Sequence, residues 1–189
     1  MDALGVFGII FIILIVFGIL LILILAGLGF FESKNVEDII KNPFSIERGV
    51  TSPRSYMTAN TSNDIIFSNS SSISCSKYTW TYGTFTSGTG TTAVSIPNAL
   101  IYGGDPTMIL AASASTVGSK VTLIKPTAMT DKTLTSWNFN EVDRTWCLSS
   151  TSGLCLFDNQ GTVELDRLSA NTGFIFTPVK AITSSTVCS

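Results

Sequence analysis

The sequence of 189 residues contains no histidine. Histidine is the commonest general base and the commonest metal ligand in proteins, so a hydrolase or a metalloenzyme would have to rely on carboxylates or cysteines alone. The four cysteines include no C-x-x-C pair of the kind that zinc sites use. No run of Lys or Arg provides the positive surface that a phosphate backbone requires, and the formal net charge is -2. We therefore expect no metal, no cofactor and no nucleic acid as a ligand.

Charge is absent from residues 3–31, a long apolar segment at the N-terminal end. As a helix this segment would reach roughly 43 Å at about 1.5 Å per residue, whereas the hydrocarbon core of a bilayer is about 30 Å thick. A cleaved signal peptide is the alternative, but such signals begin with basic residues and have a shorter apolar stretch, and here Asp2 precedes the segment. We therefore predict a single transmembrane helix at 1–31 that anchors the protein permanently in a lipid bilayer.

Residues 32–53 are expected to form a neck between the membrane and the remaining domain. Val36, Ile39 and Ile40 fall on one face of a short amphipathic helix. Pro43 ends this helix, because a proline disfavours helical geometry in the residue before it. We expect the helix to lie at the membrane surface and to be followed by a linker, and the binding of a partner protein is an alternative use for it.

Basic residues give an indication of which side of the membrane the domain occupies. Lys34, Lys41 and Arg48 follow the apolar segment and no Lys or Arg precedes it, so the positive-inside rule favours the cytosolic face. Asn60 and Asn69 begin Asn-x-Ser sequences that could be N-glycosylated, which would matter only for a lumenal domain. Chance matches to such a short pattern are unsurprising in a chain this rich in Ser and Thr.

Residues 54–189 carry an internal threefold repeat in which apolar residues alternate with polar ones. A period of two is what a strand with one buried face requires. Each repeat therefore predicts three short strands, with a fourth candidate strand after each repeat. The three strands are marked by Met57, Ile65/Phe67 and Trp80/Tyr82 in the first repeat, by Leu110, Val121/Leu123 and Trp137/Phe139 in the second, and by Leu156, Val163/Leu165 and Phe174/Phe176 in the third. The fourth strands are expected at Val94 and Ile96, at Trp146 and Leu148, and at 181–187.

This pattern of three four-stranded units resembles the β-trefoil, the fold of ricin-B-type lectins and fascin-like proteins. The resemblance implies a barrel of six strands covered by six more, with the recurrent large hydrophobic residues meeting on a pseudo-threefold axis. We therefore predict an all-β domain at 54–189 with the β-trefoil fold. A β-sandwich or a jelly roll is the alternative fold for a chain of many short strands.

The sugar-binding signature of the ricin-B-type lectins is only partly present. Those lectins hold sugars with an aspartate, an aromatic platform and a Q-x-W element. No repeat keeps Q-x-W, since Tyr78 and Thr135 stand two residues before Trp80 and Trp137. Because Trp80 and Trp137 occupy matching positions in two repeats, we expect both to lie in the core rather than to stack against a sugar.

One polar set remains as a candidate sugar site. Asp158, Asn159 and Gln160 of the third repeat stand close to the place where the family binds galactose-like sugars, so the resemblance implies a carbohydrate site there. A turn whose side chains bond the local backbone is the simpler interpretation of the same residues.

The cysteines suggest a disulfide rather than a metal site. Cys147 and Cys155 are eight residues apart across a Ser-Gly turn, so they would face each other in a tight hairpin and could form a disulfide in an oxidising compartment. Cys75 and Cys188 have no local partner. Either a second disulfide or two free thiols fits these two residues.

Because no nucleophile stands beside a recognisable base, we expect no enzymatic activity. The first functional hypothesis is a structural protein that links a membrane to a surrounding protein layer. Its architecture is similar to that of small membrane proteins or minor capsid proteins of large icosahedral DNA viruses, in which the domain would lie between an inner membrane and capsid proteins. The second hypothesis is a membrane-bound module that binds carbohydrate or a receptor.

Overall fold

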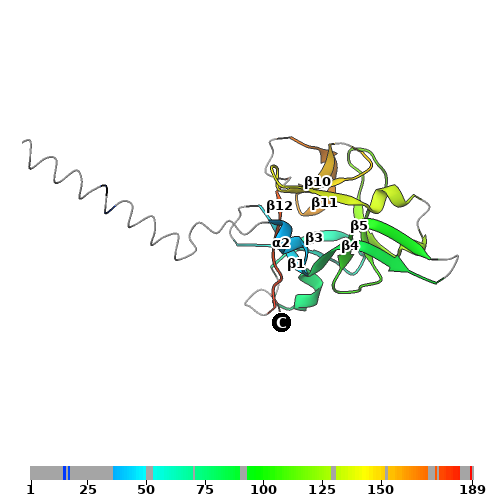
Figure 1. Ribbon diagram of the computed structural model, residues 1–189, viewed down its shortest axis with the longest axis horizontal. Coiled ribbons are helices and arrows are strands. Elements are labelled where there is room, and N and C mark those ends of the chain that lie inside the picture. Colours follow the sequence, from blue (N-terminus) through cyan, green and yellow to red (C-terminus); the bar gives the residue numbers. More distant parts are fainter. Residues whose placement is uncertain are drawn as a thin grey trace, which may run out of the picture. The chain divides into compact units, whose positions relative to one another are not determined.

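The computed structural model describes residues 15, 17, 36–49, 53–69, 71–89, 93–128, 131–151, 153–169, 173, 175–183 and 188. The chain divides into two units, Met1–Asn35 and Val36–Ser189, and the second of these holds the β domain (Figure 1). No helix in the described part of the chain is long and apolar enough to cross a bilayer. The predicted transmembrane segment, 1–31, lies outside the described residues except for Ile15 and Phe17.

The prediction of an all-β domain is confirmed, since the strands of the described residues belong to one antiparallel sheet. Along the sheet they follow the order β7-β6-β5-β4-β1-β2-β3-β11-β10-β9-β8, and β12 pairs with β1. Four short helices accompany them in the same part of the chain, namely α2 (Val36–Ile40), η1 (Cys75–Tyr78), η3 (Pro126–Ala128) and η4 (Lys132–Thr135). The strands are β1 (Phe44–Arg48), β2 (Tyr56–Ala59), β3 (Ile65–Ser68), β4 (Trp80–Ser87), β5 (Val94–Tyr102), β6 (Ile109–Ala112), β7 (Val121–Ile124), β8 (Trp137–Asn140), β9 (Thr145–Leu148), β10 (Leu154–Asn159), β11 (Thr162–Arg167) and β12 (Phe176–Lys180).

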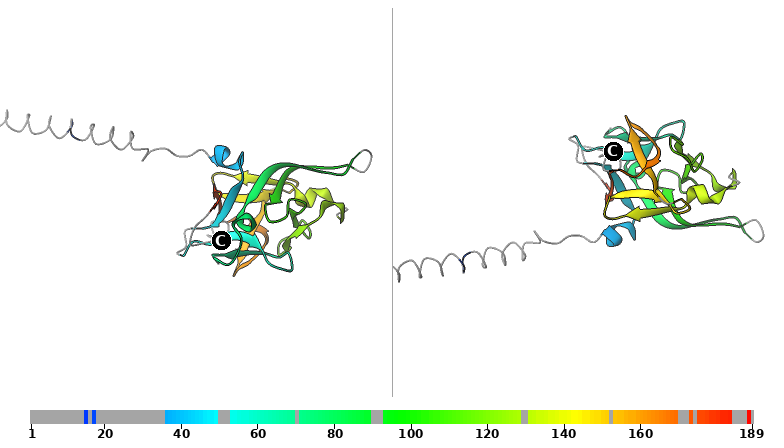
Figure 2. Two further views of the ribbon diagram at one scale, coloured as in Figure 1. Left: turned by 90° about the horizontal axis from the view of Figure 1, so that it is seen from below. Right: turned by 90° about the horizontal axis from the view of Figure 1, so that it is seen from above.

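In chain order the strands fall into three successive units of four, β1–β4, β5–β8 and β9–β12. The first and last strands of each unit, which are β1 and β4, β5 and β8, and β9 and β12, form a ring. Strand β1 lies between β12 and β4, and β4 continues into β5 through a long curved hairpin (Figure 2). The hydroxyl of Ser136, just before β8, donates to the carbonyl of Pro97 in β5 at 2.8 Å. The Phe176 amide of β12 donates to the Arg144 carbonyl beside β9 at 2.7 Å. With the β8–β9 hairpin, these contacts close the ring.

The inner strands form one hairpin in each unit, β2–β3, β6–β7 and β10–β11. Strand β11 pairs with β3. Isolated bridges join Asp64 to Thr122 and Lys120 to Glu164, so the β6–β7 hairpin touches both of the others. The three hairpins therefore meet one another, an arrangement consistent with the threefold repeat of the sequence.

The core repeats the same contact in the first two units. Trp80 and Trp137 are both fully buried, as the sequence predicted. The indole N–H of Trp80 donates to the Met57 carbonyl at 3.1 Å, and that of Trp137 donates to the Leu110 carbonyl at the same distance. Met57 and Leu110 are the residues that mark the first strand of each predicted repeat, so the sequence alignment of these two repeats matches the structure.

The third unit uses different residues at the matching place. The carbonyl of Leu156 accepts a hydrogen bond from the hydroxyl of Thr145 at 3.4 Å. In the first two units the corresponding carbonyls accept from a tryptophan indole instead. Trp146 is fully buried, and its ring stacks on Phe44 with centroids 5.8 Å apart, but its indole N–H is the one buried side-chain polar group in the described residues that has no hydrogen-bond partner. Phe174, which the sequence analysis aligned with the two tryptophans, lies outside the described residues.

One strand assignment from the sequence needs correction. No strand was predicted within the neck, yet β1 lies there, and its five residues pair with β12 from Phe44↔Lys180 to Arg48↔Phe176. Of the strand predicted at 181–187, residues 181–183 are outside any strand, and 184–187 lie outside the described residues. The beginning of the domain therefore supplies a strand that the sequence did not predict.

The short helix α2 belongs to the β domain. Glu37 and Asp38 stand in its first turn, where negative charge interacts favourably with the helix dipole. Ile39 and Ile40 are partly buried and pack against the main hydrophobic core. The apolar face that the sequence analysis placed at the membrane surface is therefore in contact with the domain itself.

Candidate functional site

The sequence-predicted sugar residues form the turn between β10 and β11. The Asp158 side chain is only 3% exposed; one carboxylate oxygen pairs with the guanidinium of Arg48, and the other accepts from the Gly161 amide at 2.8 Å. The Asn159 amide donates to the Glu164 carboxylate at 3.0 Å. Gln160 has a φ of 54°, a left-handed conformation that tight turns require. Both oxygens of Asp158 are thus engaged within the protein, and the set holds a turn in place.

A groove of about 590 Å³ lies at the opposite end of the same hairpin. Three parts of the chain form it: the β6–β7 loop, the β9–β10 loop, and the paired start of β10 and end of β11. The groove is lined by Ser115, Thr116, Val117, Thr151, Gly153, Leu154, Arg167 and Leu168. It therefore combines side chains from the second and third repeats, and no single repeat could form it.

The β6–β7 loop is fixed on β11 by backbone hydrogen bonds. The Gly118 amide donates to the Leu165 carbonyl at 2.8 Å, and the Leu165 amide donates to the Ser119 carbonyl at 2.9 Å. Gly118 has a φ of 78°, a backbone conformation that residues with a Cβ atom rarely adopt. The hydroxyls of Thr116 and Ser119 are hydrogen-bonded to each other at 2.9 Å. This wall of the groove is therefore held in place along its length.

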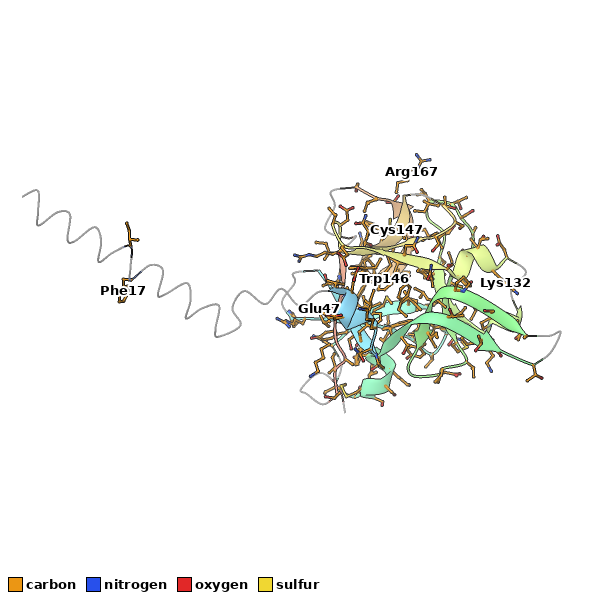
Figure 3. The ribbon with its side chains drawn as sticks, in the orientation of Figure 1. Phe17, Glu47, Lys132, Trp146, Cys147 and Arg167 are labelled. Carbon is orange, nitrogen blue, oxygen red and sulfur yellow. A yellow bond between two sulfur atoms is a disulfide. The ribbon has the colours of Figure 1, made fainter. Side chains whose placement is uncertain are left out.

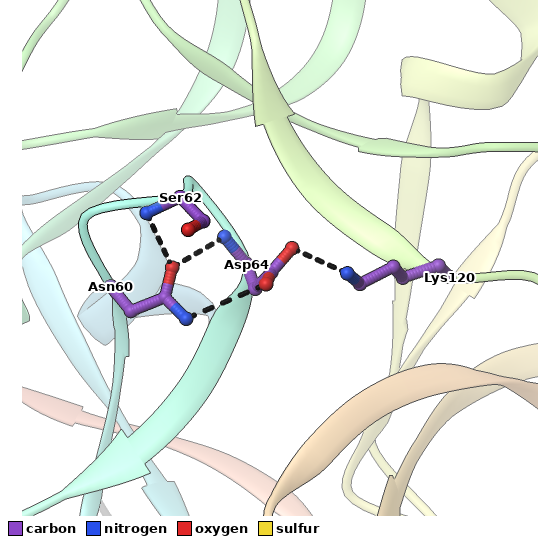
Figure 4. A network of polar contacts seen from close by, with 4 residues as sticks. All are labelled: Asn60, Ser62, Asp64 and Lys120. Atoms are coloured by element: carbon purple, nitrogen blue, oxygen red, sulfur yellow. Dashed lines mark hydrogen bonds and ion pairs between the residues drawn. The ribbon is translucent and has the colours of Figure 1, made fainter.

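A polar network anchors the base of the same loop (Figure 4). The ammonium of Lys120 lies 2.7 Å from the carboxylate of Asp64, in the turn between β2 and β3. The Asn60 side-chain carbonyl accepts from the backbone amides of Ser62 and Asp64 at 2.8 and 3.0 Å. The hydrogen bond from Lys120 is the main reason that the pKa of Asp64 is lowered below its ordinary value.

The predicted cysteine pair closes the other wall. Cys147 and Cys155 are paired in register between β9 and β10 and form a disulfide, with their Cα atoms 3.8 Å apart (Figure 3 labels Cys147). The loop that this disulfide closes contains Thr151 and Gly153 of the groove. The Leu168 amide donates to the Gly153 carbonyl at 2.9 Å, so the loop is also fastened to the end of β11.

The other two cysteines also form a disulfide, which joins η1 to the C-terminal region. Cys75 and Cys188 are 113 residues apart in the sequence, and their Cα atoms lie 5.0 Å apart. Cys188 is buried in a small cluster with Tyr56 and Tyr78. Of the two alternatives that the sequence left open, the structure therefore has the disulfide. Disulfides of this kind are typical of proteins that fold in oxidising compartments.

Arg167 is a functional candidate that the sequence analysis missed. In β11 it continues the inward-facing series of Val163 and Leu165, and it pairs in register with Leu154. Its side chain nevertheless reaches the surface (Figure 3), where it forms no ion pair with any residue that the structure describes. None of the described residues that line the groove is acidic. The signal in the sequence was an arginine at a position where the period of two calls for an apolar residue.

The remaining sequence-predicted residues do not form a second site. Trp80 and Trp137 are fully buried, so neither can stack against a sugar from solvent. Asn60 is engaged in its turn, whereas Asn69 is exposed, and their glycosylation stays a prediction. Among the described residues no three His, Cys, Asp or Glu side chains gather as a metal site would need.

No protein-family model matches the sequence, and no curated protein sequence matches it either. Among solved structures, the chain is similar to an agglutinin from Abrus precatorius, with a TM-score of 0.53 and 10% sequence identity over 75% of this chain. The chain covers 48% of that agglutinin chain, about half its length. A second similar structure is the C-terminal half of an earthworm R-type lectin in complex with GalNAc, with a TM-score of 0.46 and 11% identity, covering 72% of this chain and 96% of that one. At such low identity the first likeness shows the fold alone, and this all-β fold is consistent with the predicted β-trefoil.

Proposed function

We propose that this protein is a carbohydrate-binding module with the β-trefoil fold. The observation that carries the proposal is the likeness of its fold to that of an agglutinin. The ring of six strands and the three hairpins that meet beside it support the β-trefoil in particular, because each four-stranded unit contributes two strands to the ring and one hairpin. The alternative role, a link between a membrane and a protein layer such as a viral capsid, stays a prediction from the sequence.

The groove between the second and third repeats is the proposed binding site. Its volume of about 590 Å³ lies in the range of roughly 300–1,000 Å³ that is typical of small-molecule sites. Val117 is 54% exposed and offers an apolar surface to the C–H face of a sugar ring, while the hydroxyls of Ser115 and Thr151 can exchange hydrogen bonds with sugar hydroxyls. This mixture of apolar and hydroxyl groups fits a polyol better than it fits a purely apolar ligand.

We further propose that the module has no catalytic activity and is carried on the apolar segment 3–31 as a single-pass membrane anchor. The two disulfides favour an oxidising compartment for the domain, opposite to the cytosolic side that the flanking basic residues suggested. The disulfides are the stronger argument. Three basic residues bias the orientation of a membrane helix only modestly, whereas the cytosol keeps cysteines reduced, so disulfides are rare there.

A glycan array tests the proposed function. The full chain, purified in detergent without reducing agent, should bind a defined subset of glycans. Thr151→Val removes a hydroxyl from the groove with little change of shape and should weaken that binding roughly 3- to 10-fold, since a hydrogen bond between neutral groups contributes about 0.5–1.5 kcal/mol.

The matched control is Thr86→Val, an exposed threonine of β4 outside the groove, which should bind as the unaltered chain does. Thermal unfolding of all three proteins establishes that the fold is intact. A folded chain that binds no glycan on the array would refute the proposal.

A further inference from the structure

We infer that the groove takes carbohydrate bearing an anionic group, a carboxylate or a sulfate, and that Arg167 is the residue that binds this group. The inference rests on the proposed function, because it specifies the class of glycan that the same groove would recognise. The observations that carry it are the position of Arg167, the absence of a partner for it in the described part of the chain, and the residues around it.

The position of Arg167 is unusual for a charged residue. It lies on the face of β11 whose two previous members, Val163 and Leu165, are fully buried. Long cationic side chains at such places pack their methylene groups along apolar surface and extend the charged head group outwards. Here the neighbouring residues are Leu154, on the paired strand, and Leu168, next along the chain. All three residues line the groove, and the Arg167 side chain extends to the surface (Figure 3).

The charge of Arg167 is not neutralised by the side chains that the structure describes. Two of the other arginines are paired, Arg48 with Asp158 and Arg54 with Glu47. Among the described residues, the carboxylate of Asp166 accepts a hydrogen bond from the backbone amide of Arg167 at 2.7 Å, not from its guanidinium. The groove therefore offers one uncompensated positive charge in a chain whose formal net charge is -2.

The chemistry of arginine then indicates the ligand. A guanidinium presents its N–H groups in a planar fork that matches the two oxygens of a carboxylate or a sulfate, and such charge-assisted bonds are about twice as strong as neutral ones. The hydroxyls of Ser115 and Thr151 line the same groove and suit the hydroxyl groups of a sugar. A glycan with an acidic substituent satisfies both kinds of group, whereas a free inorganic anion would use Arg167 alone.

Titration of matched glycans tests this inference. The full chain in detergent, without reductant, is titrated with a sialylated glycan and its desialylated form, and with a sulfated glycan and its desulfated form. We expect at least one acidic glycan to bind roughly 10- to 100-fold more tightly than its neutral counterpart, the effect expected of a hydrogen-bonded charge pair. Added salt should reduce this preference, since Arg167 is exposed.

Arg167→Gln should abolish the preference, so that the acidic glycan binds only as well as the neutral one. Arg167→Lys retains the charge without the planar fork and should retain part of the preference. Lys132→Gln removes one positive charge far from Arg167 in Figure 3 and should leave the preference unchanged. Thermal unfolding of each variant shows whether the fold is intact.

Two negative results have different meanings. If neutral glycans bind and neither acidic form binds more tightly, or if Arg167→Gln retains the preference, the inference is wrong and the proposed function stands. If no glycan binds, neutral or acidic, the proposed function itself fails and the inference with it. Binding of free sulfate or acetate with the same affinity as the acidic glycans would also overturn the inference, because the sugar hydroxyls would then contribute nothing.

Discussion

Removing the disulfide between Cys75 and Cys188 should destabilise the domain about twice as much as removing the one between Cys147 and Cys155. A disulfide restricts the unfolded chain, and the loss of entropy grows with the length of the loop it closes. The sequence separations are 113 and 8 residues. The loop-entropy relation then gives about 5 kcal/mol for the first disulfide and about 2.5 kcal/mol for the second.

The comparison uses two double variants, Cys75→Ala with Cys188→Ala, and Cys147→Ala with Cys155→Ala. Each variant replaces two cysteines by the same residue, and each loses at least one well-buried side chain, since Cys188 is 4% exposed and Cys155 is fully buried. The packing losses therefore partly cancel. What remains is mainly the difference in loop length.

Thermal unfolding followed by tryptophan fluorescence provides the measurement, because Trp80, Trp137 and Trp146 are all fully buried in the folded domain. For a domain of this size, about 1 kcal/mol corresponds to a shift of roughly 2–4 °C in Tm. We expect a fall of roughly 10–20 °C without the long-range disulfide and roughly 5–10 °C without the short-range one. Equal falls, or a larger fall for the short-range pair, would refute the reasoning from loop entropy.

Three further predictions concern single contacts. Asp158→Asn should lower the free energy of unfolding by about 1–3 kcal/mol, because it removes a well-buried carboxylate from its ion pair. Glycan affinity should not change. A loss of glycan binding without a loss of stability would show that the sugar site is the β10–β11 turn and not the groove. Trp146→Phe should be about 1 kcal/mol less destabilising in chemical denaturation than Trp137→Phe, because only the indole of Trp137 has a hydrogen-bond partner to lose. The lowered pKa of Asp64 stabilises the fold above pH about 4, and this contribution disappears as the pH falls through the lowered pKa. Acid unfolding curves of Lys120→Met should therefore show a smaller loss of stability as the pH falls below about 4 than those of the unaltered chain, and identical curves would contradict this.

The inward-facing strand residues could be predicted from the sequence because their pattern is local. Pairs such as Val121 and Leu123 alternate within four residues, and both are buried where they were expected. The aligned tryptophans were also informative, since Trp80 and Trp137 make the same hydrogen bond in two repeats. Local periodicity was thus sufficient for the all-β class and for much of the repeat.

Strand β1 was missed because its evidence is not local. Phe44 and Ile46 do alternate, but they follow a helix and a proline and stand far in the sequence from the strand they pair with. The ring closes between the first and last strands of the domain, and no pattern within a short window reveals which distant segment completes it. The sequence pattern therefore did not predict the strand at Phe44–Arg48, which pairs with β12.

The groove was missed for a related reason. Its walls come from the β6–β7 and β9–β10 loops, which are assembled only when two repeats pack together. Within a single repeat the sequence offers the polar set around Asp158, but the buried ion pair of Asp158 with Arg48 depends on β1, which the sequence did not predict. A charged residue that interrupts an apolar alternation, as Arg167 does, is the one local sign that would have pointed to the groove.

The place of β1 in the ring decides where this chain can be cut. A fragment that starts at residue 54 would leave the backbone of both β4 and β12 open to solvent on the sides that β1 now occupies. Unprotected strand edges are templates for intermolecular pairing, so such a fragment should aggregate rather than fold as a monomer. Shortened versions of the protein should therefore begin no later than Val36, so that they retain both β1 and the helix α2, which packs on the core.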